Sequence, residues 1–300
     1  MKKNLAVKIA KELILANPQN KTELETFKRA AAEEHKIPYP SNMDLLSGIK
    51  KLYRNQILPP KTNNLFDLLR TRPIRSLSGI VNVSVLTKPY PCPGNCLYCP
   101  DEDGFPKSYL SGEPAAERAY RLKFNPYRQT FQRIRTLAGE GHIVDKIEMR
   151  IIGGTWSYYP KIYQQKFIAA CFAAANDFGV QKFKNSECLT PARRLPNTRS
   201  ALQVLQTEQK KNETAECRIV GISVETRPDY INPREIVHLR QLGVTRVELG
   251  VQSVFDDVLD LNRRGHKVYH TIYATKLLKN AGFKVSYQIM LNLLGSTVKR

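Results

Sequence analysis

Residues 80–100 read IVNVSVLTKPYPCPGNCLYCP, and this stretch decides both the fold and the chemistry of the chain. Residues 80–86 are rich in β-branched and apolar side chains, which predicts a buried strand. Cys92, Cys96 and Cys99 follow with the spacing C-x3-C-x2-C. Three closely spaced thiolates on one loop can hold three irons of a 4Fe–4S cluster and leave the fourth iron open to a chelating ligand. The sequence therefore predicts a cluster-binding loop directly after the first strand.

Other interpretations of the cysteine loop are weaker. A structural zinc site needs a fourth cysteine or histidine nearby, and residues 82–123 contain none beyond the three cysteines. A disulfide framework fits poorly because an odd trio leaves one thiol over. The cluster is the favoured interpretation, with zinc and a chance grouping as the alternatives.

The composition limits the class of protein. The chain has 300 residues, of which 42% are hydrophobic, enough for one large domain or a large domain with a small companion. It has no apolar run of about eighteen residues, which excludes a membrane span. The N-terminus lacks the features of a signal peptide, so we expect a cytoplasmic protein with reduced cysteines. The net charge of +20 points to a polyanionic partner such as nucleic acid, although basic proteins without one are common.

The chain divides into a helical part at 1–75 and an α/β part at 76–300. The first helix is predicted at 2–16 and the fourth at 63–70. The second is predicted to begin after a cap at Thr22 and the third after a cap at Ser41. Lys50, Lys51 and Arg54 lie on an exposed face of the third helix. After residue 79, the pattern of strand, loop and helix repeats. This pattern predicts parallel βαβ units, with strands at 80–86, 146–152, 218–224, 246–251 and 285–291 and helices at 127–138, 163–178, 233–242 and 270–281. Cys171 lies in an apolar helical run and is expected in the core.

Each chemically distinctive motif directly follows a predicted strand. Residues 92–99 follow the first strand, 153–155 the second, 225–227 the third and Gln252 the fourth. In α/β barrels the catalytic face lies at the carboxyl ends of the strands. We therefore expect these motifs to meet in one site.

The cysteine spacing, with Tyr98 before the third cysteine, resembles the cluster motif of the radical S-adenosylmethionine enzymes. Further segments resemble the catalytic subunit of Elongator and its single-chain prokaryotic relatives. They recur in the family's order from about residue 70 onwards: Lys107–Pro114, Arg118-Ala, Asn125–Gln129, Gly153–Thr155, Glu225–Tyr230 and Glu248–Ser253.

This resemblance implies an incomplete radical-SAM (β/α)6-type partial TIM barrel preceded by a small helical N-terminal domain. It implies a 4Fe–4S cluster on Cys92, Cys96 and Cys99, with S-adenosylmethionine as cofactor and acetyl-CoA as co-substrate. The substrate would be the anticodon stem-loop of tRNA. A 5′-deoxyadenosyl radical would remove hydrogen from the acetyl methyl group, and a carboxymethyl-type group would be added to carbon 5 of the wobble uridine.

The resemblance also implies residue roles. The contacts to S-adenosylmethionine would be Gly153, Gly154, Thr155, Glu225, Arg227 and Gln252. Lys146 would meet acetyl-CoA, or else be a charged strand start. The predicted nucleic-acid contacts are basic and aromatic groups: Lys50, Lys51, Arg54, Arg72, Arg75, Tyr109, Arg118, Arg121, Arg128 and Arg263. For Glu225 and Arg227 the alternative is a salt bridge to each other or to neighbours, and for Tyr109 it is core packing.

The sequence departs from the family near its end. The family continues through a final strand and an acetyltransferase-like domain, and it usually has proline where Leu291 and Leu294 stand. We therefore expect a chain truncated before the last strand, which turns over poorly unless a missing domain or partner subunits are supplied. The competing functions are a radical S-adenosylmethionine enzyme with another substrate and a nucleic-acid-binding protein that keeps its metal loop as a relic.

Overall fold

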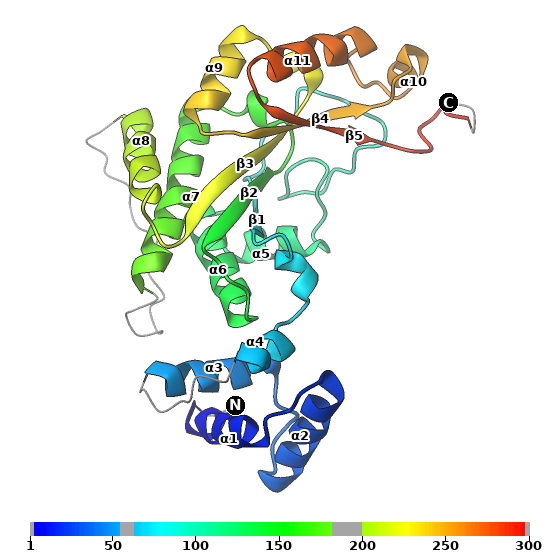
Figure 1. Cartoon of the computed structure of the whole chain (residues 1–300). Helices are drawn as coiled ribbons and strands as arrows, with labels where there is room; N and C mark the ends of the chain where they lie inside the picture. The colour runs from blue at the N-terminus through cyan, green and yellow to red at the C-terminus, as the bar shows by residue number, and fades with distance from the viewer. Residues whose placement is uncertain (1–2, 55–62, 182–199, 298–300) are drawn as a thin grey trace. The chain divides into compact units, whose positions relative to one another are not determined.

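The computed structural model describes residues 3–54, 63–181 and 200–297 (Figure 1). The chain forms two compact units, one made of Met1–Val81 with Ile134–Val144 and the other of Asn82–Arg133 with Asp145–Arg300. Among the described residues, no helix is both long enough and apolar enough to cross a bilayer.

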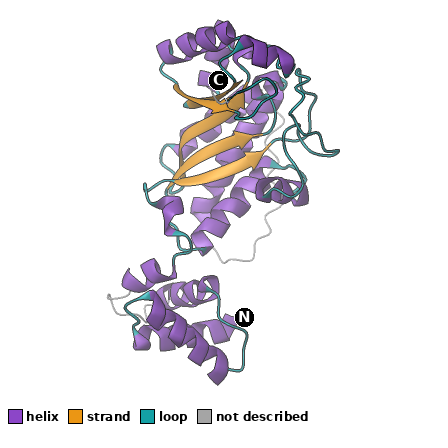
Figure 2. Ribbon diagram, turned by 90° about the vertical axis from the view of Figure 1, so that its right-hand side faces the viewer, coloured by secondary structure: helices purple, strands orange, loops and turns teal. Residues whose placement is uncertain are grey.

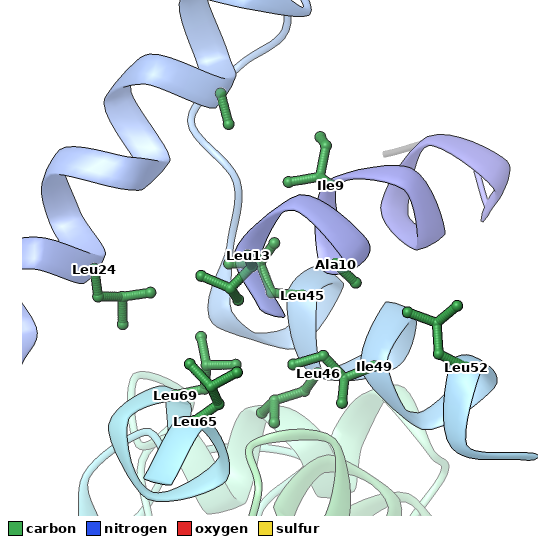
Figure 3. Packing of buried hydrophobic residues seen from close by; sticks show 11 residues of the cluster. Ile9, Ala10, Leu13, Leu24, Leu45, Leu46, Ile49, Leu52, Leu65 and Leu69 are labelled. Atoms are coloured by element: carbon green, nitrogen blue, oxygen red, sulfur yellow. The ribbon is translucent and has the colours of Figure 1, made fainter. Parts of the chain in front are cut away.

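The first unit contains helices α1 (Lys3–Ala16), α2 (Lys21–Glu34), α3 (Asn42–Arg54) and α4 (Asn63–Leu69), followed by the 3-10 turn η1 (Pro73–Ser76). Apolar side chains at helical spacing point into one shared core, shown in Figure 3. The buried members of this core are Ile9, Ala10, Leu13, Leu24, Ala31, Leu45, Leu46, Ile49, Leu52, Leu65 and Leu69. Helix propensity contributes little here compared with the burial of these faces.

The cap predicted at Ser41 is confirmed, but the cap predicted at Thr22 is wrong. Ser41 Oγ accepts a hydrogen bond from the backbone N–H of Asp44 at 3.1 Å. Helix α2 instead begins two residues before the predicted position, because the side chain of Asn20 accepts from the N–H of Glu23 at 3.0 Å. Asn20 and Glu23 have the same spacing as Thr22 and Glu25, and asparagine is preferred over threonine as the cap residue.

The described residues of the second unit form a five-stranded sheet in the order β1–β2–β3–β4–β5 (Figure 2). The pairs β2–β3, β3–β4 and β4–β5 are parallel, with helices packed along the sheet, as the sequence predicts. The strands are β1 (Val81–Leu86), β2 (Lys146–Ile152), β3 (Arg218–Thr226), β4 (Arg246–Gln252) and β5 (Lys284–Ile289). The helices and 3-10 turns are α5 (Pro114–Arg121), α6 (Pro126–Gly139), η2 (Trp156–Tyr158), α7 (Lys161–Gln181), α8 (Ala201–Asn212), η3 (Pro228–Tyr230), α9 (Pro233–Gln241), α10 (Asp256–Leu261) and α11 (Val268–Asn280).

The two faces of the sheet differ in polarity because successive side chains of a strand point to opposite faces. One face carries buried apolar residues such as Met149, Ile222 and Val247. Side chains on the other face are joined by hydrogen bonds and ion pairs across strands β2 to β5, including Arg150–Glu248 and Arg246–Glu148. The sheet therefore has one apolar face and one polar face.

Strand β5 ends two residues earlier than predicted. The N–H of Met290 still donates to Gln252 O at 3.0 Å, but Leu291 is 84% exposed and Asn292 adopts a left-handed φ of 61°. Apolar composition had favoured a longer strand, but Leu291 finds no core to pack against among the described residues. Cys171 is buried in α7, which confirms its assignment to the core.

Candidate active site

A pocket of about 400 Å³ opens at the carboxyl ends of the strands. Strands β3 to β5, the loop after β2 and the cysteine loop after β1 all contribute to it, which is the arrangement expected for an α/β barrel site. Its lining residues are Cys92, Gly94, Cys96, Tyr98, Cys99, Pro100, Ser108, Tyr109, Gly154, Thr155, Glu225, Thr226, Arg227, Gly250, Gln252, Arg264, Gln288, Ile289 and Met290. The motifs expected to meet in one site are thus brought together.

The three cysteines of the loop are unpaired thiols that face this pocket. Cys99 Sγ lies 2.8 Å from the hydroxyl of Ser108, and Cys92 Sγ lies 4.0 Å from that of Thr155. Burial raises the pKa of Cys99, and the neighbouring Cys96 and Cys92 add to this, while the Ser108 hydroxyl opposes it. Thiolates crowded in this way repel one another, and a bound cation reverses that repulsion.

The two glycines after β2 have different surroundings. A Cβ on Gly153, whose φ is 122°, would lie 2.1 Å from Thr87 Oγ1, so glycine is required there by packing against the end of β1. A Cβ on Gly154 would meet its nearest atom, Tyr159 Oη, at 3.9 Å. Gly154 and Thr155 line the pocket, and Gly153 lies behind them. Of the two glycines that the resemblance implies as contacts to S-adenosylmethionine, Gly154 is the one that lines the pocket.

Glu225 is the centre of a hydrogen-bond network in the pocket wall. The hydroxyl of Tyr109 donates to Glu225 Oε2 at 2.8 Å, and Gln288 Nε2 lies 3.3 Å from both Glu225 Oε1 and Glu248 Oε2. Glu248 in turn accepts from Arg150 at 3.0 Å and from Ser223 at 2.7 Å. The network links strands β2 to β5, and it places Tyr109 in the pocket wall beside a carboxylate.

Burial raises the pKa of Glu225, and the nearby Glu248 adds to this shift, while hydrogen bonds from Tyr109 oppose it. A raised pKa in the folded state contributes stability below the unfolded value of about 4.3, and that contribution is lost as the pH rises through the folded pKa. Glu225→Gln removes the cost of ionising this group. We expect the free energy of unfolding of Glu225→Gln, relative to that of the wild type, to increase as the pH rises from about 5 to 8.

Urea unfolding of both proteins across that range checks this prediction. The exposed substitution Glu117→Gln serves as the control and should follow the wild type at every pH. A constant difference between Glu225→Gln and the wild type would show that Glu225 ionises normally in the folded state.

Arg227 is buried and pairs with its neighbour Asp229 rather than with Glu225. Its Nε donates to Asp229 Oδ1 at 2.9 Å, and its Nη2 donates to Asp229 Oδ2 at 2.8 Å. Its Nη1 has no hydrogen-bond partner among the described residues and would lie 2.4 Å from a Cβ on Gly94. Gly94 therefore lets this guanidinium reach the cysteine loop with one donor still free.

Gln252 ends β4 in a strained conformation at the pocket. Its φ is 70°, and the register between β4 and β5 shifts between Gly250 and Gln252. Its buried Oε1 has no hydrogen-bond partner in the described part of the chain. Left-handed backbone in a residue other than glycine costs free energy and tends to occur at functional sites. The shift turns the Gln252 side chain towards the pocket.

The structure does not bring Lys146 to the pocket. Lys146 is exposed at the start of β2 and is paired in register with Arg218, at the opposite end of the strands. Several other predicted contacts already have partners within their own unit. Arg118 donates to Ser84 O at 2.9 Å, Lys50 to Ala138 O at 2.6 Å, and Arg75 pairs with Glu140 at 3.2 Å.

Exposed cations remain at Arg72, Arg121, Arg128 and Arg263, and Lys51 is half-buried. Arg121 makes a loose pair with Glu117 at 3.8 Å. Arg121 ends α5 and Arg128 lies in the first turn of α6, both between β1 and β2, and Arg263 lies between α10 and α11. The side chain of Arg54 lies outside the described residues.

Sequence reasoning missed Gln288 as a member of the pocket, and it placed Arg264, together with Arg263, only among the cationic groups near the predicted mouth. Gln288 of β5 pairs in register with Gly250 of the neighbouring strand β4. Aligning the carboxyl ends of these two strands would therefore have predicted that Gln288 lies at the pocket. Arg263 and Arg264 look alike in the sequence, yet Arg263 is exposed and Arg264 is 8% exposed. The left-handed φ of 51° at Arg263 separates the directions of these two side chains, and no pattern in the sequence indicates it.

Known proteins resemble this chain over most of its length. It is 37% identical to the tRNA uridine(34) acetyltransferase of Methanocaldococcus infernus over 97% of the chain and 51% of that protein. It is 33% identical to Elongator complex protein 3 of Schizosaccharomyces pombe over 98% of the chain and 51% of that protein. The chain therefore spans about half the length of the curated relatives it matches.

A solved structure gives the same picture. The N-terminally deleted Elp3 of Methanocaldococcus infernus matches with a TM-score of 0.54 and 36% identity, over 74% of this chain and 40% of that one. The profile of the Radical SAM superfamily matches residues 90–299, which include all three cysteines of the loop and every other residue that lines the pocket. The chain belongs to the radical SAM superfamily.

Proposed function

We propose that this chain holds a 4Fe–4S cluster on Cys92, Cys96 and Cys99, and acts in modification of the wobble uridine of tRNA. The observation that carries the proposal is the convergence of three unpaired cysteines with Glu225 and Arg227 in one pocket at the strand ends. Membership of the radical SAM superfamily supports the cluster and S-adenosylmethionine. The names of the relatives support the substrate, tRNA, and a reaction with an acetyl group.

The residues present fit such a cluster. Three thiols on one loop match three irons and leave one iron for another ligand. Free donors also face them, because Arg227 Nη1 and Arg264 Nε are buried without a hydrogen-bond partner among the described residues. Buried donors without acceptors are rare and costly, which points to an acceptor supplied by a bound group. Sulfides, thiolates and a carboxylate are all acceptors of this kind.

The chain's own residues orient S-adenosylmethionine. A cluster held by these cysteines would supply one electron for the reductive cleavage of S-adenosylmethionine. Gly154 and Thr155 offer a wall without bulky side chains, and Glu225 offers a carboxylate to amino or ribose hydrogens. Arg227 Nη1 offers a donor to the methionine carboxylate, and Gln252 Oε1 offers an acceptor.

The tRNA would approach the face on which the pocket opens. Arg263 is exposed next to Arg264 of the pocket lining, Arg121 and Arg128 are exposed between β1 and β2, and guanidinium groups suit contact with phosphates. Lys146 lies at the other end of the sheet, so its role with acetyl-CoA would require a second site there. For the whole protein, we likewise propose the use of acetyl-CoA, the formation of a carboxymethyl-type product and the involvement of any partner subunits.

Anaerobic reconstitution with iron and sulfide, followed by reduction, tests the proposal. We expect S-adenosylmethionine to be cleaved to 5′-deoxyadenosine, with faster cleavage when tRNA is added. Cleavage that is unaffected by tRNA but stimulated by another RNA or a small molecule would point to another substrate. Absence of cleavage by a protein that holds its full complement of iron would contradict the enzymatic part of the proposal.

Binding of tRNA has its own test. Three phosphate contacts predict that affinity falls roughly 20- to 40-fold between 50 and 200 mM salt. The triple substitution of Arg121, Arg128 and Arg263 by glutamine should flatten that dependence. Substituting Lys276, Lys279 and Lys284 removes the same charge, with Lys279 and Lys284 near the amino end of β5, and should leave the slope unchanged. Equal effects of both triples would assign binding to net charge alone.

A further inference from the structure

Arg264 is a buried cation held against the cysteine loop. Its Nη1 lies 3.5 Å from Cys96 Sγ, and its Nη2 donates to Gly250 O at 2.7 Å. Arg264 is only 8% exposed, and its Nε has no hydrogen-bond partner among the described residues. The guanidinium is thus anchored to β4 on one side and faces a cysteine on the other.

The backbone around Arg264 fixes this position. The N–H of Arg264 donates to Leu259 O at 2.9 Å, and the N–H of Leu97 donates to Asn262 O at 3.2 Å. Asn262 is itself held, because its Nδ2 donates to Val258 O and Leu294 O at 2.8 Å each. The segment that carries Arg264 is therefore docked directly onto the loop that carries Cys96.

No described residue neutralises the charge of Arg264. Arg227, the other buried arginine of the pocket, forms a two-point ion pair with Asp229. In the described part of the chain, no carboxylate lies within ion-pair distance of Arg264. An unpaired buried charge is costly, so such an arrangement is expected where a bound anionic group supplies the missing charge. Three thiolates and a cluster provide that group.

We propose that Arg264 is a positioning residue that hydrogen-bonds the Cys96 sulfur and makes the cluster easier to reduce. This inference rests on the proposed cluster. Adding an electron makes the site more negative, and a fixed cation in contact with a sulfur ligand stabilises the reduced form. Hydrogen bonds to the sulfurs and net charge are known determinants of the potential of iron–sulfur clusters.

The test is a redox titration of the reconstituted 300-residue chain in the absence of S-adenosylmethionine, monitored by electron paramagnetic resonance. For Arg264→Gln we expect an unchanged iron content and a midpoint potential lower by about 59 mV or more, a tenfold loss in the one-electron reduction equilibrium. Arg264→Lys keeps the charge but loses the planar fork, so its potential should lie between those of Arg264→Gln and the wild type. Arg263→Gln is the matched control, since it removes the same charge from the adjacent exposed residue and should not shift the potential.

A potential of Arg264→Gln equal to that of Arg263→Gln would overturn the proposal. If Arg264→Gln fails to retain iron, Arg264→Lys decides. A cluster of the lysine variant with a potential below that of the wild type supports the role of Arg264, whereas a wild-type potential, or loss of the cluster in that variant too, overturns it. None of these outcomes affects the wild-type cluster or its cleavage of S-adenosylmethionine, so failure here is distinguishable from failure of the proposed function.

Discussion

Replacing Cys96 with alanine is expected to abolish both cluster assembly and the cleavage of S-adenosylmethionine. Cys96 is the middle ligand of the proposed trio and is the most buried of the three. The two remaining thiolates can hold only two irons, and the sulfur that faces Arg264 is gone. Iron and sulfide analysis after anaerobic reconstitution, together with 5′-deoxyadenosine quantified by chromatography, measures both effects.

Cys171→Ala is the matched control for this substitution. Cys171 is equally a free cysteine, but it is buried in α7, away from the pocket lining. This variant should retain iron, the brown colour of the cluster and 5′-deoxyadenosine formation. Wild-type product from Cys96→Ala would remove Cys96 from the ligand set. Equal loss in both variants would indicate general damage to the fold.

Gly153→Ala is expected to destabilise the second unit, whereas Gly154→Ala is expected to weaken the binding of S-adenosylmethionine. The added Cβ at residue 153 would lie 2.1 Å from Thr87 Oγ1, in a backbone conformation that strains any side chain. Overpacking and positive φ together cost about 2–5 kcal/mol. At residue 154, where φ is 61°, the new methyl group has room, so beyond a backbone strain of about 1–2 kcal/mol its effect falls on the pocket that it enters. Urea unfolding and equilibrium binding of S-adenosylmethionine to the reconstituted protein separate the two effects.

A double-mutant cycle with Thr87 identifies the cause of the first effect. Thr87→Ala removes the oxygen that the new methyl group would meet, although it also loses the hydrogen bonds of this hydroxyl to Gly153 O and Tyr159. The combined variant Thr87→Ala/Gly153→Ala should be less destabilised than the sum of the two single variants. Strict additivity would assign the whole cost to backbone strain. A stability of Gly153→Ala equal to the wild type would contradict the packing role itself.

The arrangement of the strands was predictable because local pattern and global fold agree. Runs such as 246–251 alternate or accumulate apolar residues as buried strands do, and the motifs after them fall where parallel strands end. The order of the chain then places residues 92–99 and 225–227 on the same edge of the sheet. This topological argument needs no knowledge of any side-chain contact.

The roles of adjacent, identical residues were not predictable. Gly153 and Gly154 both have positive φ, but they differ in what surrounds them, Thr87 in one case and the pocket in the other. Arg263 and Arg264 differ only in direction, which follows from a left-handed backbone at Arg263. The partner of Arg227 is Asp229, two residues away, although Glu225 has the same charge and the same spacing. Such differences arise from tertiary contacts, and a single sequence does not encode them in any local pattern.

The most direct measurement is Mössbauer spectroscopy of the anaerobically reconstituted chain, with and without S-adenosylmethionine. A 4Fe–4S cluster held by three cysteines predicts that one iron alone changes its signal when S-adenosylmethionine is added. A protein that binds zinc instead of iron would contradict the assignment of the cysteine loop. So would a cluster whose four irons are all indifferent to S-adenosylmethionine.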